Sequence, residues 1–477
     1  MAYSLGQRYL AFVVQLVVTV VLARLLTPQE TGIFSLAAST VAIGHLLREF
    51  GVADYLFAQK DVSNDKLRRA FTVTLVLAWV IAAVLWAFAG KLAEWYSEPG
   101  LKTTIHWLCL NFGLLPFGSI ATALMARELR FRLLFWTQSS GVLVGGALTV
   151  ALAWNGYSYL SMAIGAVATN LWSIGLLLLI QRRHVLLMPL FTGLGDVVRF
   201  GGATLSARVL EQMPLRGIDF IISASLGFHA TGIYSKSSSL LGSFHEFFNS
   251  AVARVAQPAF ASARHGGEDV HARYIQLTVL VASALGLFFP FLNIHAEQIV
   301  LLLFGPRWQE CVPILQLASL LSLVSAPYMM GPSLLAAMGA VRAQLRMQLV
   351  SAPLALAAIL VGAQVNLLTI VWLLAAATLV RLYMLDRALL AVCGIRSWSI
   401  VQQLGRTAAV CAVAAGSAFA SQQALRSAQA PALATLFIDA VVMGLAAVLT
   451  AKVVKHPLYA ETMAVLARLF KGRRAWA

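Results

Sequence analysis

Long apolar stretches, separated by short polar segments, follow one another along almost the whole chain. A helix that crosses a bilayer needs about 20 mostly apolar residues, a length that apolar segments of soluble domains seldom reach. Fourteen stretches meet this requirement: residues 4–25, 33–56, 70–89, 104–126, 133–153, 158–180, 201–222, 231–252, 275–295, 312–335, 344–363, 367–390, 401–420 and 433–451. The pattern predicts an all-α polytopic membrane protein with fourteen transmembrane helices.

The composition supports a membrane protein and gives little sign of an enzyme. Hydrophobic residues make up 60% of the chain and charged residues only 11%, against about 25% charged residues in soluble domains. The first apolar stretch is longer than a signal-peptide core, so we expect it to be a spanning helix. The sequence contains no H-E-x-x-H motif, phosphate-binding loop or nucleophile elbow. We therefore expect no enzymatic activity, no cofactor, no metal site and no nucleic-acid partner.

The basic residues are distributed unevenly among the connecting loops. Loops after even-numbered stretches contain eighteen Lys and Arg residues, whereas loops after odd-numbered stretches contain five. Because cytoplasmic loops of membrane proteins are enriched in Lys and Arg, this distribution places the even-numbered loops in the cytoplasm. It predicts a multi-pass membrane protein with both termini cytoplasmic.

A sequence repeat relates the two halves of the chain. Residues 31–35 read TGIFS and residues 231–235 read TGIYS, and further identities occur at the same offset of 200 residues. The offset moves the first stretch onto the seventh, so the two copies cross the membrane in the same sense. This arrangement predicts two parallel six-helix repeats, the plan of many transporters with a cleft between the repeats.

The repeat and the loops together define the predicted domains. They are an N-terminal lobe (1–181), an inter-lobe cytoplasmic loop (182–200), a C-terminal lobe (201–390), helices 13 and 14 (391–453) and a basic amphipathic cytoplasmic tail (454–477). Gly141 and Gly145, spaced four residues apart in the fifth stretch, predict close helix packing inside the first lobe.

Ionisable and polar residues cluster on single faces of stretches one, two, seven and eight. A charge at the bilayer centre costs about 2.5–3.5 kcal/mol on insertion scales, so such residues usually face a wet cavity or a partner. The predicted substrate-binding residues are Arg8, Gln15, Arg48, Glu49, Arg208, Glu211, Arg216, Asp219, Lys236 and Glu246. Alternatively, the (i, i+3) pairs Arg208–Glu211 and Arg216–Asp219 only neutralise each other. The last two stretches carry little of this pattern, apart from Asp439.

Four short motifs resemble those of Wzx-type polysaccharide exporters. They are LARLLTPQETG at residues 22–32, ELRFR at 128–132, LFGPRW at 303–308 and AMG at 337–339. These exporters share a superfamily with multidrug and toxin extrusion antiporters and lipid II flippases. The resemblance covers the chain to about residue 390.

The resemblance implies a flippase that moves a polyprenyl-diphosphate-linked oligosaccharide across the bacterial cytoplasmic (inner) membrane by alternating access. Its product would enter exopolysaccharide, capsule or lipopolysaccharide O-antigen synthesis, with membrane lipid, a polysaccharide polymerase and glycosyltransferases as candidate partners. Two alternatives remain open at this point. A cation-coupled multidrug antiporter would usually have twelve spans and an acidic, aromatic pocket. A membrane enzyme of polysaccharide assembly would need a large outer loop.

Overall fold

The computed structural model describes residues 2–48, 63–195, 217–246, 269–395, 397–428 and 430–456, and a few shorter pieces between them. These residues form helices and connecting turns, with no strand among them. Twelve of the helices are long and apolar enough to cross a membrane. Residues 217–246, which include parts of the predicted seventh and eighth stretches, are also helical. The all-helical, multi-pass membrane fold expected from the hydropathy pattern is confirmed.

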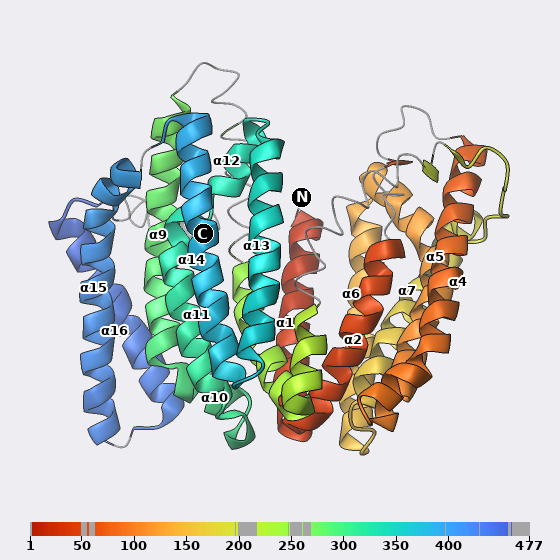
Figure 1. The fold of residues 1–477 in the computed structure, drawn as a ribbon, viewed down its shortest axis with the longest axis horizontal. Coiled ribbons are helices and arrows are strands. Elements are labelled where there is room, and N and C mark those ends of the chain that lie inside the picture. The colour runs from red at the N-terminus through yellow and green to blue at the C-terminus, as the bar shows by residue number, and fades with distance from the viewer. Residues whose placement is uncertain are drawn as a thin grey trace, which may run out of the picture. The chain divides into compact units, whose positions relative to one another are not determined.

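The first compact unit comprises Met1–Lys236 and Ile359–Leu367. Its helices are α1 (Ala2–Leu25), α2 (Pro28–Arg48), α4 (Asn64–Trp95), α5 (Pro99–Arg127), α6 (Phe131–Trp154) and α7 (Leu160–Val185). Within it α6 packs on both α1 and α7, and α5 packs on α4, α7 and α2 (Figure 1). The unit is therefore a bundle of neighbouring helices, in which short turns join α1 to α2 and α4 through α7 in succession.

Small residues bring α6 and α7 close together. A Cβ atom added to Gly145 would lie 1.8 Å from Oγ1 of Thr169, and one added to Gly165 would lie 1.7 Å from Oγ1 of Thr149. A Cβ at Gly141 would lie 2.2 Å from Oγ of Ser173. Only hydrogen fits at these positions. The close packing predicted for Gly141 and Gly145 is confirmed.

Part of the predicted inter-lobe loop belongs to the first unit and packs on α4. The backbone N–H of Leu190 donates to Oγ1 of Thr72 at 2.7 Å, and Nε of Arg68 donates to the carbonyl of Met188 at 3.0 Å. The Leu187 side chain is buried in a cluster that includes Phe71. The beginning of the segment after α7 is thus held on the first turns of α4.

The second compact unit comprises Ser237–Ala358 and Leu368–Ala477. Its elements are α9 (Val270–Ile294), α10 (Ala296–Leu303), η1 (Pro306–Trp308), α11 (Cys311–Ser325), η2 (Ala326–Tyr328), α12 (Gly331–Ala337), α13 (Val341–Gly362), α14 (Leu367–Cys393), α15 (Ser397–Ser427) and α16 (Ala432–Val453). The end of α13 and the first residue of α14 belong to the first unit. α15 packs on α9 and α16, and α11 packs on α9.

Two details of the second unit differ from the sequence prediction. The connection predicted between residues 295 and 312 contains the short helix α10. The predicted stretch 312–335 is divided into α11, η2 and α12. Pro327 lies in the 3-10 turn and Pro332 in the first turn of α12. Proline removes a backbone donor and clashes inside a continuing helix, which explains the interruption.

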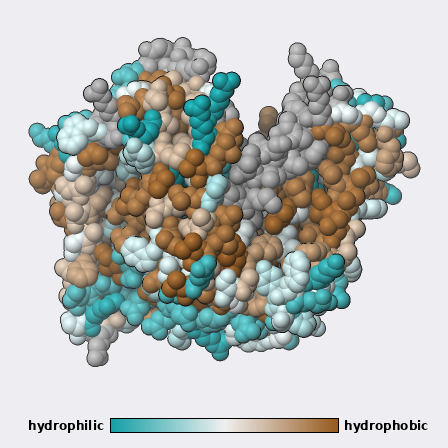
Figure 2. All heavy atoms as spheres, viewed as in Figure 1, coloured by the Kyte–Doolittle hydropathy of each residue, from teal (hydrophilic) through white to brown (hydrophobic). Residues whose placement is uncertain are grey.

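Large apolar side chains are exposed along the outer helix faces. On α4 Val80 and Val84 are 55% and 60% exposed, and on α16 Phe437 and Leu445 are 71% and 60% exposed. Figure 2 shows hydrophobic residues along the flanks of the helices, with hydrophilic residues mostly near the helix ends. Such exposure would be unfavourable in water but is expected for helices that face lipid.

Candidate functional site

The site begins where α2 starts, because the family-like motif at residues 22–32 builds a capped helix there. The backbone N–H of Thr27 donates to Oε2 of Glu30 at 2.7 Å, and the N–H of Glu30 donates to Oγ1 of Thr27 at 3.2 Å. This reciprocal pair is a capping box, and Pro28 occupies the favoured first helical position. Ser158, in the turn between α6 and α7, donates to the other oxygen of Glu30. The start of α2 is therefore fixed in direction.

One turn later, the two copies of the repeat touch each other through glycine. A Cβ added to Gly32 would lie 1.9 Å from the carbonyl oxygen of Phe228, and one added to Gly232 would lie 1.8 Å from the carbonyl oxygen of Pro28. Pro28 and Phe228 are themselves 200 residues apart. The contact is therefore reciprocal, as a two-fold relation between the copies would produce. Any side chain at either glycine would push the backbones apart.

Hydroxyl groups follow the same reciprocal pattern. Oγ of Ser35 donates to Oγ of Ser235 at 2.7 Å. Thr31 donates to the carbonyl of residue 27 at 3.1 Å, and Thr231 donates to the carbonyl of residue 227 at 3.0 Å. We call the contact formed by Thr31, Gly32 and Ser35 with Thr231, Gly232 and Ser235 the repeat crossing. It is neutral and made almost entirely of small residues.

Aromatic residues hold residues 217–236 against other helices of the first unit. The hydroxyl of Tyr96, which follows α4, donates to the carbonyl of Phe220 at 2.9 Å. Its ring lies 6.2 Å from the ring of Phe228, and both phenylalanines pack on a core formed mainly by α2, α4 and α5. Burial raises the pKa of Tyr96, so its hydroxyl stays protonated and remains a donor at neutral pH.

Two of the predicted site residues lie beside the repeat crossing. Ser39, on α2, donates to Oδ2 of Asp219. Lys236, one turn beyond Gly232, is only 7% exposed. Both belong to the first unit. The structure thus brings one predicted acid and one predicted base next to the contact between the two copies.

The other predicted residues are dispersed or lie outside the described part of the chain. Arg8 and Gln15 are exposed on α1, and Arg48 is half-buried at the last residue of α2. Glu246 is exposed and belongs to the second unit. Outside the described residues lie Glu49, Arg208, Glu211 and Arg216. That all ten residues line one cavity stays a prediction.

The remaining family-like motifs form turns. Leu129 adopts φ +57 between Glu128 and Arg130, whose side chains pair at 2.8 Å. Gly339 adopts φ +74 after α12, and Gly305 adopts φ +90 before η1. Positive φ favours glycine strongly. These motifs therefore shape connections between helices, and the crossing serines, which the charge pattern did not single out, follow instead from the repeat.

Sequence relatives come from polysaccharide biosynthesis. The lipopolysaccharide biosynthesis protein WzxC of Escherichia coli K12 is 24% identical over 65% of this chain and 63% of its own length. The succinoglycan biosynthesis transport protein ExoT of Rhizobium meliloti is 26% identical, also over 65% of this chain and 63% of its own length. The teichuronic acid biosynthesis protein TuaB of Bacillus subtilis is 23% identical over 80% of this chain and 79% of its own length. The alignments thus span less than two thirds of WzxC and ExoT.

Two solved structures share the fold. The lipid II flippase MurJ in an inward closed conformation matches 96% of this chain and 99% of its own, with a TM-score of 0.77 at 10% identity. An inward-facing MATE family multidrug resistance transporter of the MOP superfamily matches 79% of this chain and 94% of its own, with a TM-score of 0.55 at 11% identity. At these identities the likeness concerns the fold alone.

A family assignment comes from the sequence itself. The match to the family extends over residues 21–313, more than half of the 477 residues. It includes the capping box of α2, the repeat crossing and the turn around Gly305. The chain belongs to the polysaccharide biosynthesis protein family.

Proposed function

We propose that this protein moves a polyprenyl-diphosphate-linked oligosaccharide across the bacterial cytoplasmic membrane by alternating access. The product would feed exopolysaccharide, capsule or O-antigen synthesis. Support comes from relatives whose names place them in lipopolysaccharide, succinoglycan and teichuronic acid biosynthesis, one of them as a transport protein. The fold shared with a lipid II flippase agrees with an isoprenoid-linked sugar as the transported molecule.

The repeat crossing is the observation on which the transport mechanism rests. Alternating access requires a contact between the two repeats that closes one end of the substrate path and can later part. The Gly32–Gly232 contact and the Ser35–Ser235 hydrogen bond have this character, because they join equivalent residues of both repeats and contain no charge. A serine that loses such a partner can bond its own helix backbone instead. We infer that the crossing opens and closes during transport.

The basic residues of the predicted site would carry the diphosphate. Arg48 and Arg208 are expected in the inner part of the membrane, Arg216 near its middle and Lys236 toward the outer side. Arginine binds phosphate oxygens through two parallel hydrogen bonds, which suits a diphosphate. Lys236 is buried beside the closed crossing, so we propose that it meets the substrate only after the crossing opens.

The membrane potential would favour this direction of transport. Moving one negative charge out of a negative cytoplasm is favourable by roughly 2.3 kcal/mol per 100 mV. We propose that both termini lie in the cytoplasm, as the loop charges indicate. Reporter fusions after Arg132 and Arg273 should then report cytoplasm, and a fusion after Trp308 the outside; the opposite pattern would overturn the orientation.

The direct test uses purified protein in liposomes that contain a fluorescent polyprenyl-diphosphate oligosaccharide. Protein-dependent movement of the sugar between leaflets is expected, and Arg216→Ala should reduce its rate severalfold. Arg24→Ala, which removes an exposed arginine at the end of α1, is the matched control and should transport normally. If protein-containing and empty liposomes behave alike, the proposed function is wrong. If transport occurs but Arg216→Ala is normal, only the assigned role of Arg216 fails.

A further inference from the structure

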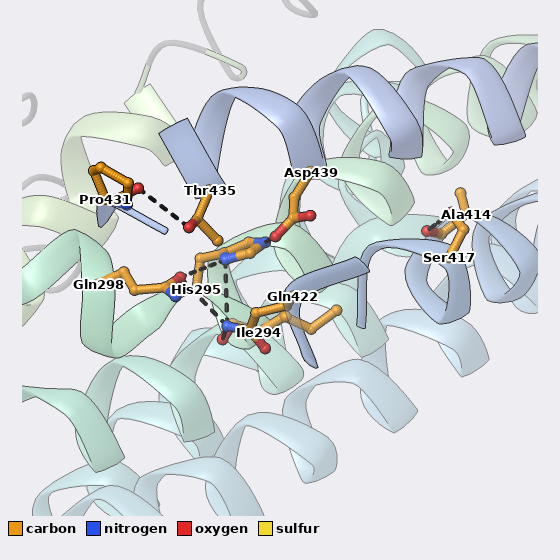
Figure 3. Close-up of polar contacts among 9 residues, drawn as sticks. All are labelled: Ile294, His295, Gln298, Ala414, Ser417, Gln422, Pro431, Thr435 and Asp439. Carbon is orange, nitrogen blue, oxygen red and sulfur yellow. Dashed lines mark hydrogen bonds and ion pairs between the residues drawn. The ribbon is translucent and has the colours of Figure 1, made fainter. Parts of the chain in front are cut away.

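A buried pair of ionisable side chains joins three helices of the second unit. His295 follows the last residue of α9, immediately before α10, and Asp439 lies on α16. Both side chains are 0% exposed, and Nε2 of His295 lies 3.5 Å from Oδ2 of Asp439 (Figure 3). Neither residue belongs to the predicted substrate site. We call this group, with Gln298 and Gln422, the His295–Asp439 corner.

Hydrogen bonds on the other side of the imidazole fix which nitrogen carries a proton. Nδ1 of His295 lies 2.6 Å from Oε1 of Gln298. Gln422, from α15, donates its amide to the carbonyl of Ile294 at 3.0 Å and approaches the same Oε1 at 3.3 Å. The amide nitrogen of Gln422 also lies 3.4 Å from Nδ1, but Oε1 of Gln298 is much nearer at 2.6 Å, so Oε1 is the acceptor and Nδ1 of His295 its donor. This leaves Nε2 to face Asp439, as Figure 3 shows.

The carboxylate has no other source of compensation among the described residues. Neither oxygen of Asp439 accepts a hydrogen bond there, and Nε2 of His295 has no hydrogen-bond partner either. Thr435, one turn before Asp439, donates to the carbonyl of Pro431 at 3.2 Å. At this end of the adjoining helices, Glu297 of α10 and Arg426 of α15 are about half-exposed and pair with each other at 3.2 Å. Arg273 of α9 and Arg406 of α15 lie near the opposite ends of their helices. A bare buried carboxylate beside a nitrogen lone pair would be strongly unfavourable.

We propose that His295 and Asp439 form a proton-binding site that fastens α16 to the junction of α9 and α10. One proton lies between Nε2 and Oδ2, so the pair is neutral either as imidazolium with carboxylate or as imidazole with carboxylic acid. Elsewhere α16 packs on α15 through small and apolar residues such as Ala414, Met443 and Ala447. The shared proton therefore adds a directional polar contact to these apolar ones.

The proposal predicts how stability depends on pH. Above about pH 5 an unfolded Asp is almost fully ionised, because its usual pKa is about 3.9. The folded wild-type pair holds one proton, whereas folded Asp439→Asn holds none at this position, because the asparagine amide donates to a neutral Nε2. The unfolded chains of both proteins bind the same protons. The ratio of the wild-type unfolding constant to that of Asp439→Asn should therefore rise about tenfold per pH unit between pH 5 and 8.

The measurement is equilibrium unfolding of the full chain in mixed micelles with increasing dodecyl sulfate, followed by tryptophan fluorescence at several pH values. Glu297→Gln is the matched control, because it removes an exposed carboxylate from the same corner. The ratio of the wild-type unfolding constant to that of Glu297→Gln should not change tenfold per pH unit. A ratio between wild type and Asp439→Asn that does not change with pH would overturn the proposal.

A second reference variant keeps the proposal testable if Asp439→Asn does not fold. The double variant His295→Phe with Asp439→Leu has no titrating group at the corner. Relative to it, the wild-type unfolding constant should be constant below about pH 6.5, the usual pKa of histidine, and should rise about tenfold per unit above it. A ratio that instead falls up to this pH and is constant above it would show that the pair binds no proton.

Discussion

The repeat crossing and the His295–Asp439 corner are both polar contacts between helices far apart in sequence, but they differ in chemistry. The crossing joins glycines and serines, carries no charge and occurs in two equivalent halves. The corner joins an ionisable pair that is fully buried. The difference suggests which contact can move. Neutral small residues can part at little cost, whereas parting a buried acid from the one partner it has among the described residues is expensive.

Hydroxyl groups that can bond their own helices keep the cost of separating the crossing low. Thr31 and Thr231 already bond their own helix backbones, and Ser35 and Ser235 could do the same after parting. At the corner, no such alternative partner lies among the described residues for Asp439. We therefore expect transport to depend on opening the crossing and to leave the corner closed.

A disulfide across the crossing should give the largest effect. In a chain without its native cysteines, Ser35→Cys combined with Ser235→Cys places two thiols where the hydroxyl oxygens lie 2.7 Å apart. This approach is close enough for a disulfide to form. After oxidation the crossing cannot open, so transport in liposomes should fall to the level without protein and return when a reductant is added.

Each single-cysteine variant, oxidised in the same way, serves as the control and should transport normally. Cross-linking is measured by the shift of a proteolysed sample on a denaturing gel. A fully cross-linked protein that still transports would show that the crossing does not open during transport. The crossing and the His295–Asp439 corner would then not differ in mobility.

Added methyl groups at the crossing should have the next largest effect. Gly32→Ala and Gly232→Ala each place a Cβ within 2 Å of an opposing carbonyl oxygen. Overpacking of this kind costs roughly 1–3 kcal/mol, and it falls only on the conformation in which the crossing is closed. Transport should therefore drop by about 5- to 150-fold at normal protein abundance.

Gly242→Ala is the matched control, because it adds a methyl to the same helical segment where a Cβ would meet nothing within 4 Å. Its transport rate should equal that of the wild type. Normal transport by both Gly32→Ala and Gly232→Ala would show that the closed crossing is not part of the cycle.

The two regions also differ in how far the sequence could predict them. The crossing follows from the 200-residue offset, because the residues that match in sequence are the residues that touch. The helices follow from apolar length. By contrast, His295 ends one stretch and Asp439 was only a lone charge in the last one. Their pairing depends on how α9, α10 and α16 pack together, and no repeat or residue spacing in the sequence predicts that packing.

The same reason explains the other differences between prediction and structure. The short helix α10 and the 3-10 turn η2 depend on local proline positions and on packing. A hydropathy pattern averaged over about 20 residues does not resolve either of these. The predicted charged faces were derived from helical angles alone. Such angles place side chains on one side of a helix but do not say which neighbour that side meets, as the exposure of Arg8 and Gln15 on α1 illustrates.

The smallest effect should come from the cap of α2, which supports the crossing without taking part in it. Thr27→Ala removes the hydroxyl that accepts from the N–H of Glu30 and donates to its carboxylate at 2.9 Å. Loss of such a cap costs about 0.5–2 kcal/mol of stability. The backbone N–H of Thr27 still donates to Glu30 in this variant, and Ser158 still holds the other oxygen. The direction of α2 and the Gly32–Gly232 contact should therefore be kept. The unfolding transition should move to lower denaturant, while transport by the folded protein changes less than about twofold.

Glu30→Ala removes the bonds to both Thr27 and Ser158 and should reduce stability more. A loss of transport by Thr27→Ala as large as that of Gly32→Ala, at unchanged stability, would mean that the cap itself moves during the cycle.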